Sequence, residues 1–490
     1  MGGLHQGHAR LIQRAVAGSA HPGSVLVSLY INPLQFGDGE DFDCYPRSFE
    51  ADCLLAQQAG AAALWCPDDH QIYPDGVAAG WKLQAPSTLQ SGLCGPLRPG
   101  HFDGVCTVVS RLLALVQPRQ LWLGEKDWQQ LVILRRLVAD LGLPVRVRGC
   151  ATVREPDGLA ASSRNRYLVP KQRSMATSIG AALRDAATEL QRSQADQADV
   201  LTGLRHQLEK VGLEVEYVEV VDPSTLQPAA SEQSLRLLAI AVRCGATRLI
   251  DHVFVMTRAP IVAIDGPAGA GKSTVTRAFA ERMGLLYLDT GAMYRAVTLW
   301  VQEHGADPAN AEAVEVLLEG LEVDLSPLRN GVQTVCINGR DVTEAIRDPR
   351  VTGSVSKVAA HSCVRALLTR QQQRLGEHGG LVAEGRDIGT AVFPDAELKV
   401  FLTATPAERA RRRASDLQSR GHSVPALSEL ETQIVERDRL DSTRAIAPLV
   451  QSDDAMELIT DGMSIEAVID ALEDLFRGRV AEEVWPTPER

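Results

Sequence analysis

A glycine-rich stretch near the middle of the chain places the strongest constraint on what this sequence can fold into. The stretch reads GPAGAGKST from Gly266 to Thr274, with apolar Ile261 to Ile264 before it and a helical pattern from Val275 to Met283 after it. A buried strand, a turn of this composition and a helix match the phosphate-binding loop, in which backbone N–H groups cradle phosphate oxygens. In such a loop Lys272 reaches the β- and γ-phosphates, and the Ser273 hydroxyl can ligate Mg²⁺. The sequence therefore predicts an α/β nucleoside-triphosphate-binding domain that begins near residue 259. Its expected ATP-binding residues are Gly266, Pro267, Ala268, Gly269, Ala270, Gly271, Lys272, Ser273 and Thr274.

Length and composition set limits on the remainder of the chain. Its 490 residues favour two to four domains, and 45% hydrophobic and 23% charged residues describe an ordinary globular protein. The net charge of −12 argues against nucleic acid as a partner. No apolar run approaches membrane-spanning length, and no signal peptide is visible. Nine cysteines without a C-x-x-C pair suit a reducing compartment. We therefore expect a cytoplasmic protein with neither a membrane nor a nucleic-acid partner.

The chain opens on Met1, Gly2, Gly3, Leu4, His5, Gln6, Gly7 and His8. Two histidines three residues apart at the start of a helix would lie on one face, where neutral imidazole N–H groups can stabilise a phosphate. A plain amino-terminal tail remains the alternative.

Further loops in the first half follow predicted strands. Residues 24–31 and 120–123 read as parallel strands, and ligands of α/β proteins bind at the carboxyl ends of such strands. Residues 51–63 and 173–208 read as helices, and residues 253–260 read as the linker to the second half. Ser162, Ser163 and Arg164 together offer hydroxyl donors and a guanidinium fork for a phosphate or carboxylate.

Five motifs of the first half occur in a recognisable order. They are HxGH, NPxQFG with ED and YPR, RPGHFxGVxTVV, GEKDxQQ and DGLAxSSRNxYL. In this order they closely resemble pantothenate synthetase (pantoate–β-alanine ligase) over about residues 1–255. The resemblance implies a Rossmann-like subdomain over residues 1–150 and a small α+β subdomain over residues 151–256. Members of that family carry a first β-strand before the Met-Gly motif, so we expect the sheet of the chain as written to lack it.

The same resemblance implies site residues and a mechanism. His5 and His8 would contact ATP phosphates, with His8 the family's catalytic histidine, and Lys126 would offset phosphate charge. Gln35 and Gln130 would hold pantoate, with Gln35 also near β-alanine. The ATP site would comprise residues 1–8, Gly124, Glu125, Lys126, Asp127, Val153, Ala161, Ser162, Ser163 and Arg164. Pantoate would attack the α-phosphorus of ATP, and β-alanine would then displace AMP from the pantoyl adenylate. The family is typically dimeric, so we expect a homodimer through this half.

The second half carries its own set of motifs. GPAGAGKST, LDTGAMYR, EGRDIGTAVFP and ERDxxDxxR resemble bacterial cytidylate kinase over about residues 259–478. The resemblance implies a monophosphate-binding insert at about 325–370, including residues 351–365, and a mobile lid at about 409–425. The CMP pocket would comprise Thr290, Arg295, Ser356, Arg365, Arg386, Asp387, Arg437, Asp441 and Arg444. Asp387 and Arg365 would read the cytosine edge, while Lys272, Mg²⁺ and lid arginines would stabilise the transferred phosphoryl group.

Together the halves predict a bifunctional enzyme, an arrangement that resembles one known in cyanobacteria. Its expected substrates are ATP, pantoate, β-alanine, CMP and dCMP, with Mg²⁺ accompanying ATP. One alternative is an active nucleoside monophosphate kinase that carries an inactive or nucleotidyltransferase-like first half. Another is a kinase that prefers UMP or AMP as acceptor.

Overall fold

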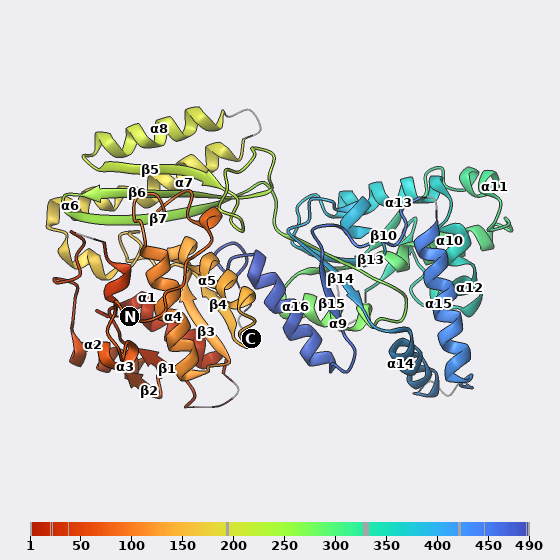
Figure 1. The fold of residues 1–490 in the computed structure, drawn as a ribbon. Helices are drawn as coiled ribbons and strands as arrows, with labels where there is room; N and C mark the ends of the chain where they lie inside the picture. The colour runs from red at the N-terminus through yellow and green to blue at the C-terminus, as the bar shows by residue number, and fades with distance from the viewer. Residues whose placement is uncertain are drawn as a thin grey trace. The chain divides into compact units, whose positions relative to one another are not determined.

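The computed structural model describes residues 2–488 apart from 20, 22, 38, 193–195, 327–332, 420–422, 445 and 487. The chain forms two compact units (Figure 1). The first contains residues 1–257 together with 477–486, and the second contains residues 258–476 together with 487–490. None of the helices in the described part of the chain is long and apolar enough to span a membrane.

The amino-terminal part of the first unit is an α/β layer. Its strands form two parallel pairs, β1 (Leu26–Ser28) with β2 (Ala63–Trp65), and β3 (Gln120–Gly124) with β4 (Arg146–Cys150). The two pairs do not join into one sheet among the described residues. The prediction of an absent first strand concerns this sheet and stays a prediction. The helices here are α1 (Gln6–Ala17), α2 (Phe49–Gln58), α3 (Asp69–Ile72), α4 (His101–Val116) and α5 (Trp128–Asp140), with short 3-10 turns at Pro33–Gln35, Ser87–Leu89 and Glu125–Asp127.

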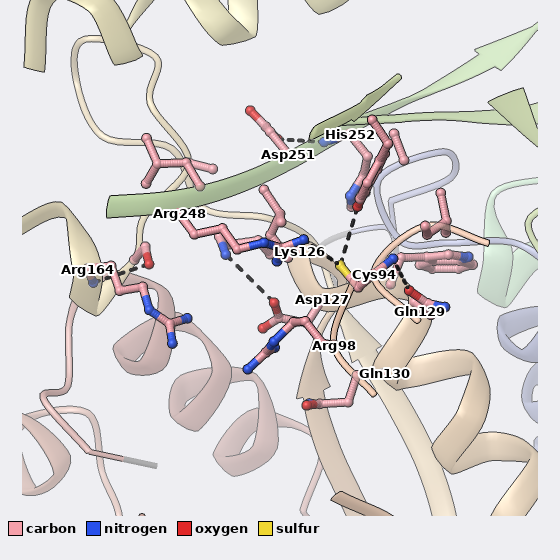
Figure 2. A pocket seen from close by; sticks show the side chains of 18 of the residues that line it. Cys94, Arg98, Lys126, Asp127, Gln129, Gln130, Arg164, Arg248, Asp251 and His252 are labelled. Carbon is pink, nitrogen blue, oxygen red and sulfur yellow. Dashed lines mark hydrogen bonds and ion pairs between the residues drawn. The ribbon is translucent and has the colours of Figure 1, made fainter. Parts of the chain in front are cut away.

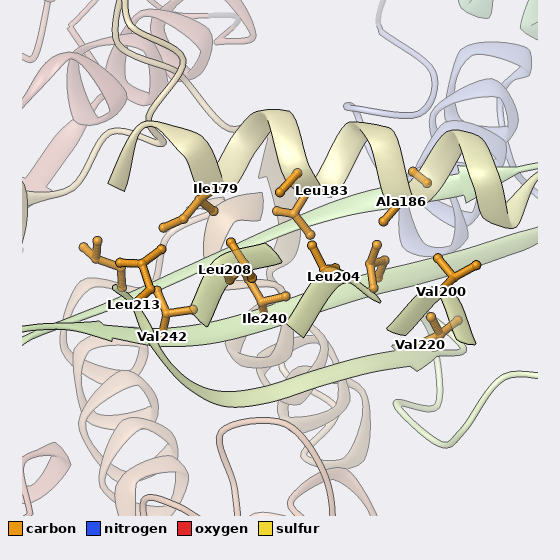
Figure 3. Close-up of a cluster of buried hydrophobic side chains, with 14 of the residues drawn as sticks. Ile179, Leu183, Ala186, Val200, Leu204, Leu208, Leu213, Val220, Ile240 and Val242 are labelled. Atoms are coloured by element: carbon orange, nitrogen blue, oxygen red, sulfur yellow. The ribbon is translucent and has the colours of Figure 1, made fainter. Parts of the chain in front are cut away.

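The remainder of the first unit is an antiparallel sheet covered by helices. Strands β5 (Glu214–Val221), β6 (Leu235–Cys244) and β7 (Thr247–Met256) form a meander. It follows a 3-10 turn (Ser163–Tyr167) and helices α6 (Pro170–Ala176), α7 (Ser178–Leu190) and α8 (Gln197–Lys210). Figure 3 shows the core between them, in which Ile179, Leu183 and Ala186 of α7 repeat at helical spacing and face the sheet. Leu204 and Leu208 of α8 join the same core.

Two sequence predictions in this region were wrong. The predicted helix over residues 173–208 is divided, because α7 ends at Leu190 and Asp196 caps a new helix by accepting the Ala198 N–H at 2.8 Å. The predicted linker over residues 253–260 is partly strand, because β7 pairs with β6 as far as Met256. The apolar, β-prone run from Val253 to Val255 favoured a strand there.

The second unit is built on a five-stranded parallel sheet in the order β15-β14-β8-β13-β9. Its central strand β8 (Ile261–Asp265) is buried throughout, which confirms the reading of its apolar run as an internal strand. The other strands are β9 (Leu286–Asp289), β13 (Leu381–Gly385), β14 (Leu398–Thr403) and β15 (Met456–Ile459), and a separate antiparallel sheet contains β10 (Val323–Leu325), β11 (Val335–Ile337) and β12 (Arg340–Asp341). Glu384 of β13 lies opposite both Ile264 of β8 and Asp289 of β9, so three strands end at one edge.

Helices surround this sheet. They are α9 (Lys272–Met283), α10 (Thr290–Glu303), α11 (Ala311–Val316), α12 (Pro349–Val358), α13 (Ser362–Leu375), α14 (Pro406–Ser419), α15 (Leu427–Thr443) and α16 (Ile465–Arg479), with a 3-10 turn at Ala345–Arg347 and a π turn at Ile388–Val392. The insert predicted at 351–365 consists of most of α12 and the start of α13, with a break at residues 359–361.

After α16 the chain continues as a short segment, residues 480–486, which we call the carboxyl-terminal segment. It belongs to the first unit although it follows the second unit in sequence. Val480, Ala481 and Glu482 are at most 7% exposed. The sequence analysis assigned no role to this segment.

Candidate active sites

The phosphate-binding loop leaves β8 and enters α9 as predicted. Its glycines take backbone conformations that other residues avoid, with φ of +151° at Gly266 and +87° at Gly271. A Cβ atom at Gly266 would lie 2.0 Å from the backbone oxygen of Leu402, so only glycine fits there. Gly271 caps α9 and turns the first N–H groups of that helix toward the loop.

Lys272 is buried inside this loop. Its Nζ donates to the carbonyl oxygens of Gly266 at 2.7 Å and of Pro267 at 2.8 Å. Burial, and next the charge of Arg386, hold the pKa of Lys272 well below its usual value. The two loop carbonyls thus hold the Lys272 ammonium group inside the loop. Phosphate oxygens are stronger acceptors than carbonyls, so a bound phosphate would attract the ammonium group away from them.

A cleft of about 1070 Å³ opens beside the loop. Residues 268–274 line it, while Gly266 and Pro267 contribute the carbonyls described above. Every residue predicted for the monophosphate pocket also lines this cleft. They come from α10 (Thr290, Arg295), α12 (Ser356), α13 (Arg365), the end of β13 (Arg386, Asp387) and α15 with its carboxyl end (Arg437, Asp441, Arg444).

The cleft holds several arginines, and carboxylates neutralise most of them. Arg365 forms an ion pair with Asp387, and the two side chains are 6% and 8% exposed. Arg444 lies 3.7 Å from the same carboxylate, and Arg386 donates to Asp441 at 3.1 Å.

Two guanidinium groups in the cleft, those of Arg437 and Arg444, each have a buried nitrogen without a hydrogen-bond partner among the described residues. Arg437 Nε is buried without a hydrogen-bond partner among the described residues, and burial followed by the charge of Arg386 lowers the pKa of Arg437. Since an unpaired buried donor is costly, a bound anion would satisfy it.

The carboxyl edge of the sheet offers oxygen atoms near the loop. Glu384 is buried and accepts a hydrogen bond from Tyr287 Oη at 2.6 Å through Oε1. Its Oε2 has no partner in the described part of the chain, and Ser273 lies within hydrogen-bonding reach of its carboxylate. Burial, and next the charge of Asp289, raise the pKa of Glu384. A hydroxyl and an orphaned carboxylate oxygen are donors that suit Mg²⁺. The described residues contain no group of three or more His, Cys, Asp or Glu that could hold a metal by themselves.

The predicted lid corresponds to α14 and its neighbours. Arg412 and Arg413 line the cleft. Arg409, in contrast, is 3% exposed and donates to Asp438 and to the Ala268 carbonyl, so it fixes the helix to the loop and does not face the cleft. Arg420 lies outside the described residues. Sequence reasoning missed Glu384 and Tyr294 as cleft residues, although both stand inside quoted motifs.

The first unit brings the two amino-terminal histidines together. Their ring centroids are 4.1 Å apart at the start of α1. His5 Nδ1 accepts the Gly7 N–H at 3.1 Å, and His8 Nδ1 accepts the His5 N–H at 3.3 Å. Because both Nδ1 atoms are acceptors, a neutral ring carries its proton on Nε2, where it can donate to a ligand.

Electrostatics keep these rings neutral. Burial, and next the charge of Lys126, lower the pKa of His5 to about 4. Burial, and next its neighbour His5, hold the pKa of His8 well below its usual value. The plain-tail alternative does not fit this arrangement, since α1 is capped by these residues and contributes Ile12 to a buried core. Met1 lies outside the described residues.

A cavity in the first unit joins the two predicted subdomains (Figure 2). Of the residues predicted for the ligase site, Lys126, Asp127, Gln130, Ser162 and Arg164 line it, whereas His5, His8 and Gln35 are not among its lining residues. Lys126 Nζ lies 3.7 Å from an Asp127 carboxylate oxygen. Gly7 and Ala161 are neighbours, and the Ala161 N–H donates to Val153, so these residues adjoin the histidine turn.

Acidic residues of the ED segment hold two arginines of this site. Arg164 donates to Asp41 at 2.9 and 2.7 Å, and Arg98 donates to Glu40 at 2.6 Å. Although burial opposes it, the paired arginine keeps the pKa of each carboxyl below its usual value. These pairs fix the guanidinium groups before any ligand binds.

Gln35 is placed by residues that the sequence analysis did not single out. Its carbonyl contacts His101 Nδ1 at 2.6 Å, and Arg98 donates to it at 3.3 Å. Cys94, Tyr217 and Arg248 also line the cavity and were missed. Tyr217 on β5 and Arg248 on β7 lie far from the motif loops in sequence, and Cys94 precedes the RPGHF motif without belonging to it. Gly124 ends β3 beside Lys126. Glu125 is 1% exposed and does not line the cavity; its carboxylate instead accepts hydrogen bonds from the carboxyl-terminal segment.

Comparison with known proteins gives a consistent result for each unit. The pantoate-β-alanine ligase family model matches residues 1–254, and the cytidylate kinase family model matches residues 262–477. The chain is 75% identical over 489 residues to the bifunctional pantoate ligase/cytidylate kinase of Synechococcus sp. (strain WH7803), with 100% of each chain covered. It is 66% identical to the protein of that description from Prochlorococcus marinus (strain MIT 9303), also with 100% of each covered. The crystal structure of pantothenate synthetase from Thermus thermophilus aligns with a TM-score of 0.49 and 42% identity, covering 52% of this chain and 91% of that one.

Proposed function

The chain belongs to the bifunctional pantoate ligase/cytidylate kinase family, and from this premise we propose which of its residues carry each of the two reactions. The protein is a pantoate–β-alanine ligase and a cytidylate kinase that uses ATP in both reactions.

In the ligase reaction ATP lies between the histidine turn and the loop after β3. His5 and His8 donate through Nε2 to ATP phosphates, and Lys126 offsets the charge that grows on the α-phosphate. The 4.1 Å separation of the rings and their lowered pKa values support this role. The ATP site further includes residues 2–4, 6 and 7, Gly124, Asp127, Val153, Ala161, Ser162, Ser163 and Arg164, with Glu125 contributing its backbone.

The acceptor acid occupies the side of this cavity that Gln130 lines, and Gln35 adjoins that side through the contacts of its carbonyl with Arg98 and His101. Gln35 and Gln130 orient pantoate so that its carboxylate oxygen attacks the α-phosphorus and diphosphate leaves. The β-alanine amine, after losing a proton, attacks the acyl carbon of the adenylate and AMP leaves. Catalysis here is mainly positioning, because the mixed anhydride is already reactive.

In the kinase reaction CMP or dCMP occupies the arginine-rich cleft. Arg386, Arg437 and Arg444 bind its phosphate, and the orphaned Nε of Arg437 supports that assignment. Arg365 and Asp387 read the cytosine edge, with Thr290, Arg295, Ser356 and Asp441 completing the pocket. A CMP phosphate oxygen attacks the γ-phosphorus of ATP and ADP leaves, while Lys272 stabilises the charge on the transferred group.

Mg²⁺ accompanies ATP in this site. Ser273 would hold it, with Glu384 Oε2 close by, and the ion would neutralise phosphate charge. Arg412 and Arg413 on α14 approach the phosphates when the lid closes.

The partners are small molecules, with no role for nucleic acid or a membrane. The protein works in the cytoplasm, where ATP is available, and pairs with a second copy through its ligase unit. Size-exclusion chromatography with light scattering tests the dimer, and a mass equal to one chain would refute it.

Product analysis tests the assignment of residues. With pantoate and β-alanine the ligase releases AMP, and with CMP the kinase releases ADP. We expect His8→Ala to abolish AMP formation and leave ADP formation intact, and Lys272→Ala to do the opposite. If His8→Ala left AMP formation unchanged, the proposed ligase site would be wrong.

A further inference from the structure

The carboxyl-terminal segment lies outside the regions matched by the two family models, although the full-length relatives cover it. The ligase family model ends at residue 254 and the kinase family model ends at residue 477. Nevertheless residues 477–486 are part of the first unit. A segment that follows the kinase region therefore contributes to the ligase unit.

The segment and the ligase loop exchange hydrogen bonds in both directions. The N–H groups of Glu482 and Glu483 donate to the two oxygens of Glu125, at 2.7 and 3.0 Å. In return the carboxylates of Glu482 and Glu483 accept the N–H groups of Ala151 at 3.0 Å and Thr152 at 2.9 Å. We call these four hydrogen bonds the clamp.

Each of the two glutamates of the clamp also forms an ion pair with the first unit. Glu482 also pairs with Arg14 of α1, and a Glu483 oxygen lies 3.5 Å from His252 Nε2. His252 is on β7 and lines the ligase cavity (Figure 2). Burial opposes ionisation of Glu483, but the charge of His252 and the N–H of Thr152 outweigh burial and lower the pKa of Glu483 to about 2.

The positions of these contacts relate the clamp to the ligase site. Glu125 directly follows β3, and Ala151 and Thr152 directly follow β4. The clamp therefore joins the carboxyl ends of two parallel strands, the edge at which α/β proteins bind ligands. Lys126 is the next residue after Glu125, and Val153 is the next after Thr152.

Burial indicates that the clamp fixes its groups firmly. Glu125 is 1% exposed and Glu482 is 7% exposed. Burial, and next the charge of Glu483, raise the pKa of Glu125 to about 7, and the N–H of Glu483 opposes that rise. Without the segment, the Glu125 carboxylate would lose both of its backbone donors beside the residue that contacts ATP.

We propose that Glu482 and Glu483 are positioning residues of the ligase, and that the clamp sets the loop that carries Lys126 against the ATP phosphates. This inference rests on the proposed role of Lys126. The kinase reaction does not depend on the clamp.

The test uses the full chain and a double-mutant cycle. Its variants are Glu482→Ala/Glu483→Ala, Lys126→Ala and the combination of all three, with Glu189→Ala on an exposed face of α7 as the matched control. We measure kcat and KM for AMP formation, ADP formation with CMP, and thermal unfolding of each variant. Because a displaced catalytic group typically costs ten- to a hundredfold in rate, we expect ligase kcat to fall about ten- to a hundredfold in the double glutamate variant. ADP formation stays within about twofold, and Glu189→Ala leaves kcat unchanged.

The combined variant separates positioning from simple stabilisation. If the clamp acts through Lys126, adding the glutamate changes to Lys126→Ala lowers kcat by less than about threefold, because residues that act as a unit are not additive. If the clamp only stabilises the fold, the same changes lower kcat equally with and without Lys126, and that result would overturn the inference. A ligase unaffected by Glu482→Ala/Glu483→Ala would overturn it as well.

The same experiment distinguishes a failure of the proposed role of Lys126 from a failure of the inference about the clamp. If Lys126→Ala alone left AMP formation unchanged, the proposed role of Lys126 would fail and the inference with it. If Lys126→Ala abolished AMP formation but Glu482→Ala/Glu483→Ala left it unchanged, the proposed role of Lys126 would stand and only the role of the clamp would be refuted.

Discussion

We predict that Asp387→Asn destabilises the kinase unit, because Asp387 neutralises the charge of buried arginines in the cleft. Asp387 is 8% exposed on its side chain, pairs with Arg365 and lies 3.7 Å from Arg444. The amide keeps the shape of the carboxylate but leaves two guanidinium groups without a counter-charge. Removing one partner of a buried pair usually costs about 3–5 kcal/mol, and the low exposure gives little solvent screening to reduce it.

The loss of stability in Asp387→Asn can be measured as a lower melting temperature of the kinase unit. For a unit of this length a loss of 1 kcal/mol lowers the melting temperature by about 2–4 °C, so Asp387→Asn should lower that of the kinase unit by about 6–20 °C. Scanning calorimetry would follow the transition that ATP with CMP shifts upward in the parent protein. The exposed change Asp453→Asn is the matched control and should leave the transition in place.

Arg365→Met supplies the comparison that could refute this reasoning. It leaves Asp387 beside Arg444, so we expect a smaller loss than for Asp387→Asn. An unchanged melting temperature for Asp387→Asn would show that this carboxylate does not balance the cleft. An equal loss in the two variants would show that Arg444 does not share the charge.

Three further outcomes are expected. Gly266→Ala should abolish ADP formation with AMP formation unchanged, because its Cβ would lie 2.0 Å from the Leu402 carbonyl oxygen, and product analysis checks it. Leu208→Ala should lower the unfolding free energy of the ligase unit by about 2–5 kcal/mol, since Leu208 is fully buried, and urea unfolding measures this loss. The pKa of His5 is lowered in the folded state, so the unfolded chain binds more protons between about pH 4 and 6.5; stability of the ligase unit should fall as pH drops through that window, less so in His5→Ala.

The parts of this protein that sequence predicted best are those in which local pattern and chemistry coincide. The strand at Ile261, the loop and α9 are contiguous, so their geometry follows from composition and spacing. The residues predicted for the monophosphate pocket converge on one cleft because each stands inside a motif at a strand or helix end.

Tertiary contacts account for what the sequence could not predict. Nothing in the local pattern around Glu125 indicates that its carboxylate is covered by residues far along the chain. The helix break before Asp196 was readable from its capping position, whereas the burial of Arg409 depends on Asp438 of another helix. Arg248 lines the cavity because β7 pairs with β6, and such long-range strand pairing cannot be read from one sequence.

The carboxyl-terminal segment has a consequence for the order of events during protein synthesis. The ligase unit needs residues that the ribosome makes only after the whole of residues 258–476. At about 5–20 residues per second, roughly 10–45 s separate the emergence of residue 257 from that of Glu482. The nascent ligase unit therefore lacks the clamp until residues 258–476 have been translated.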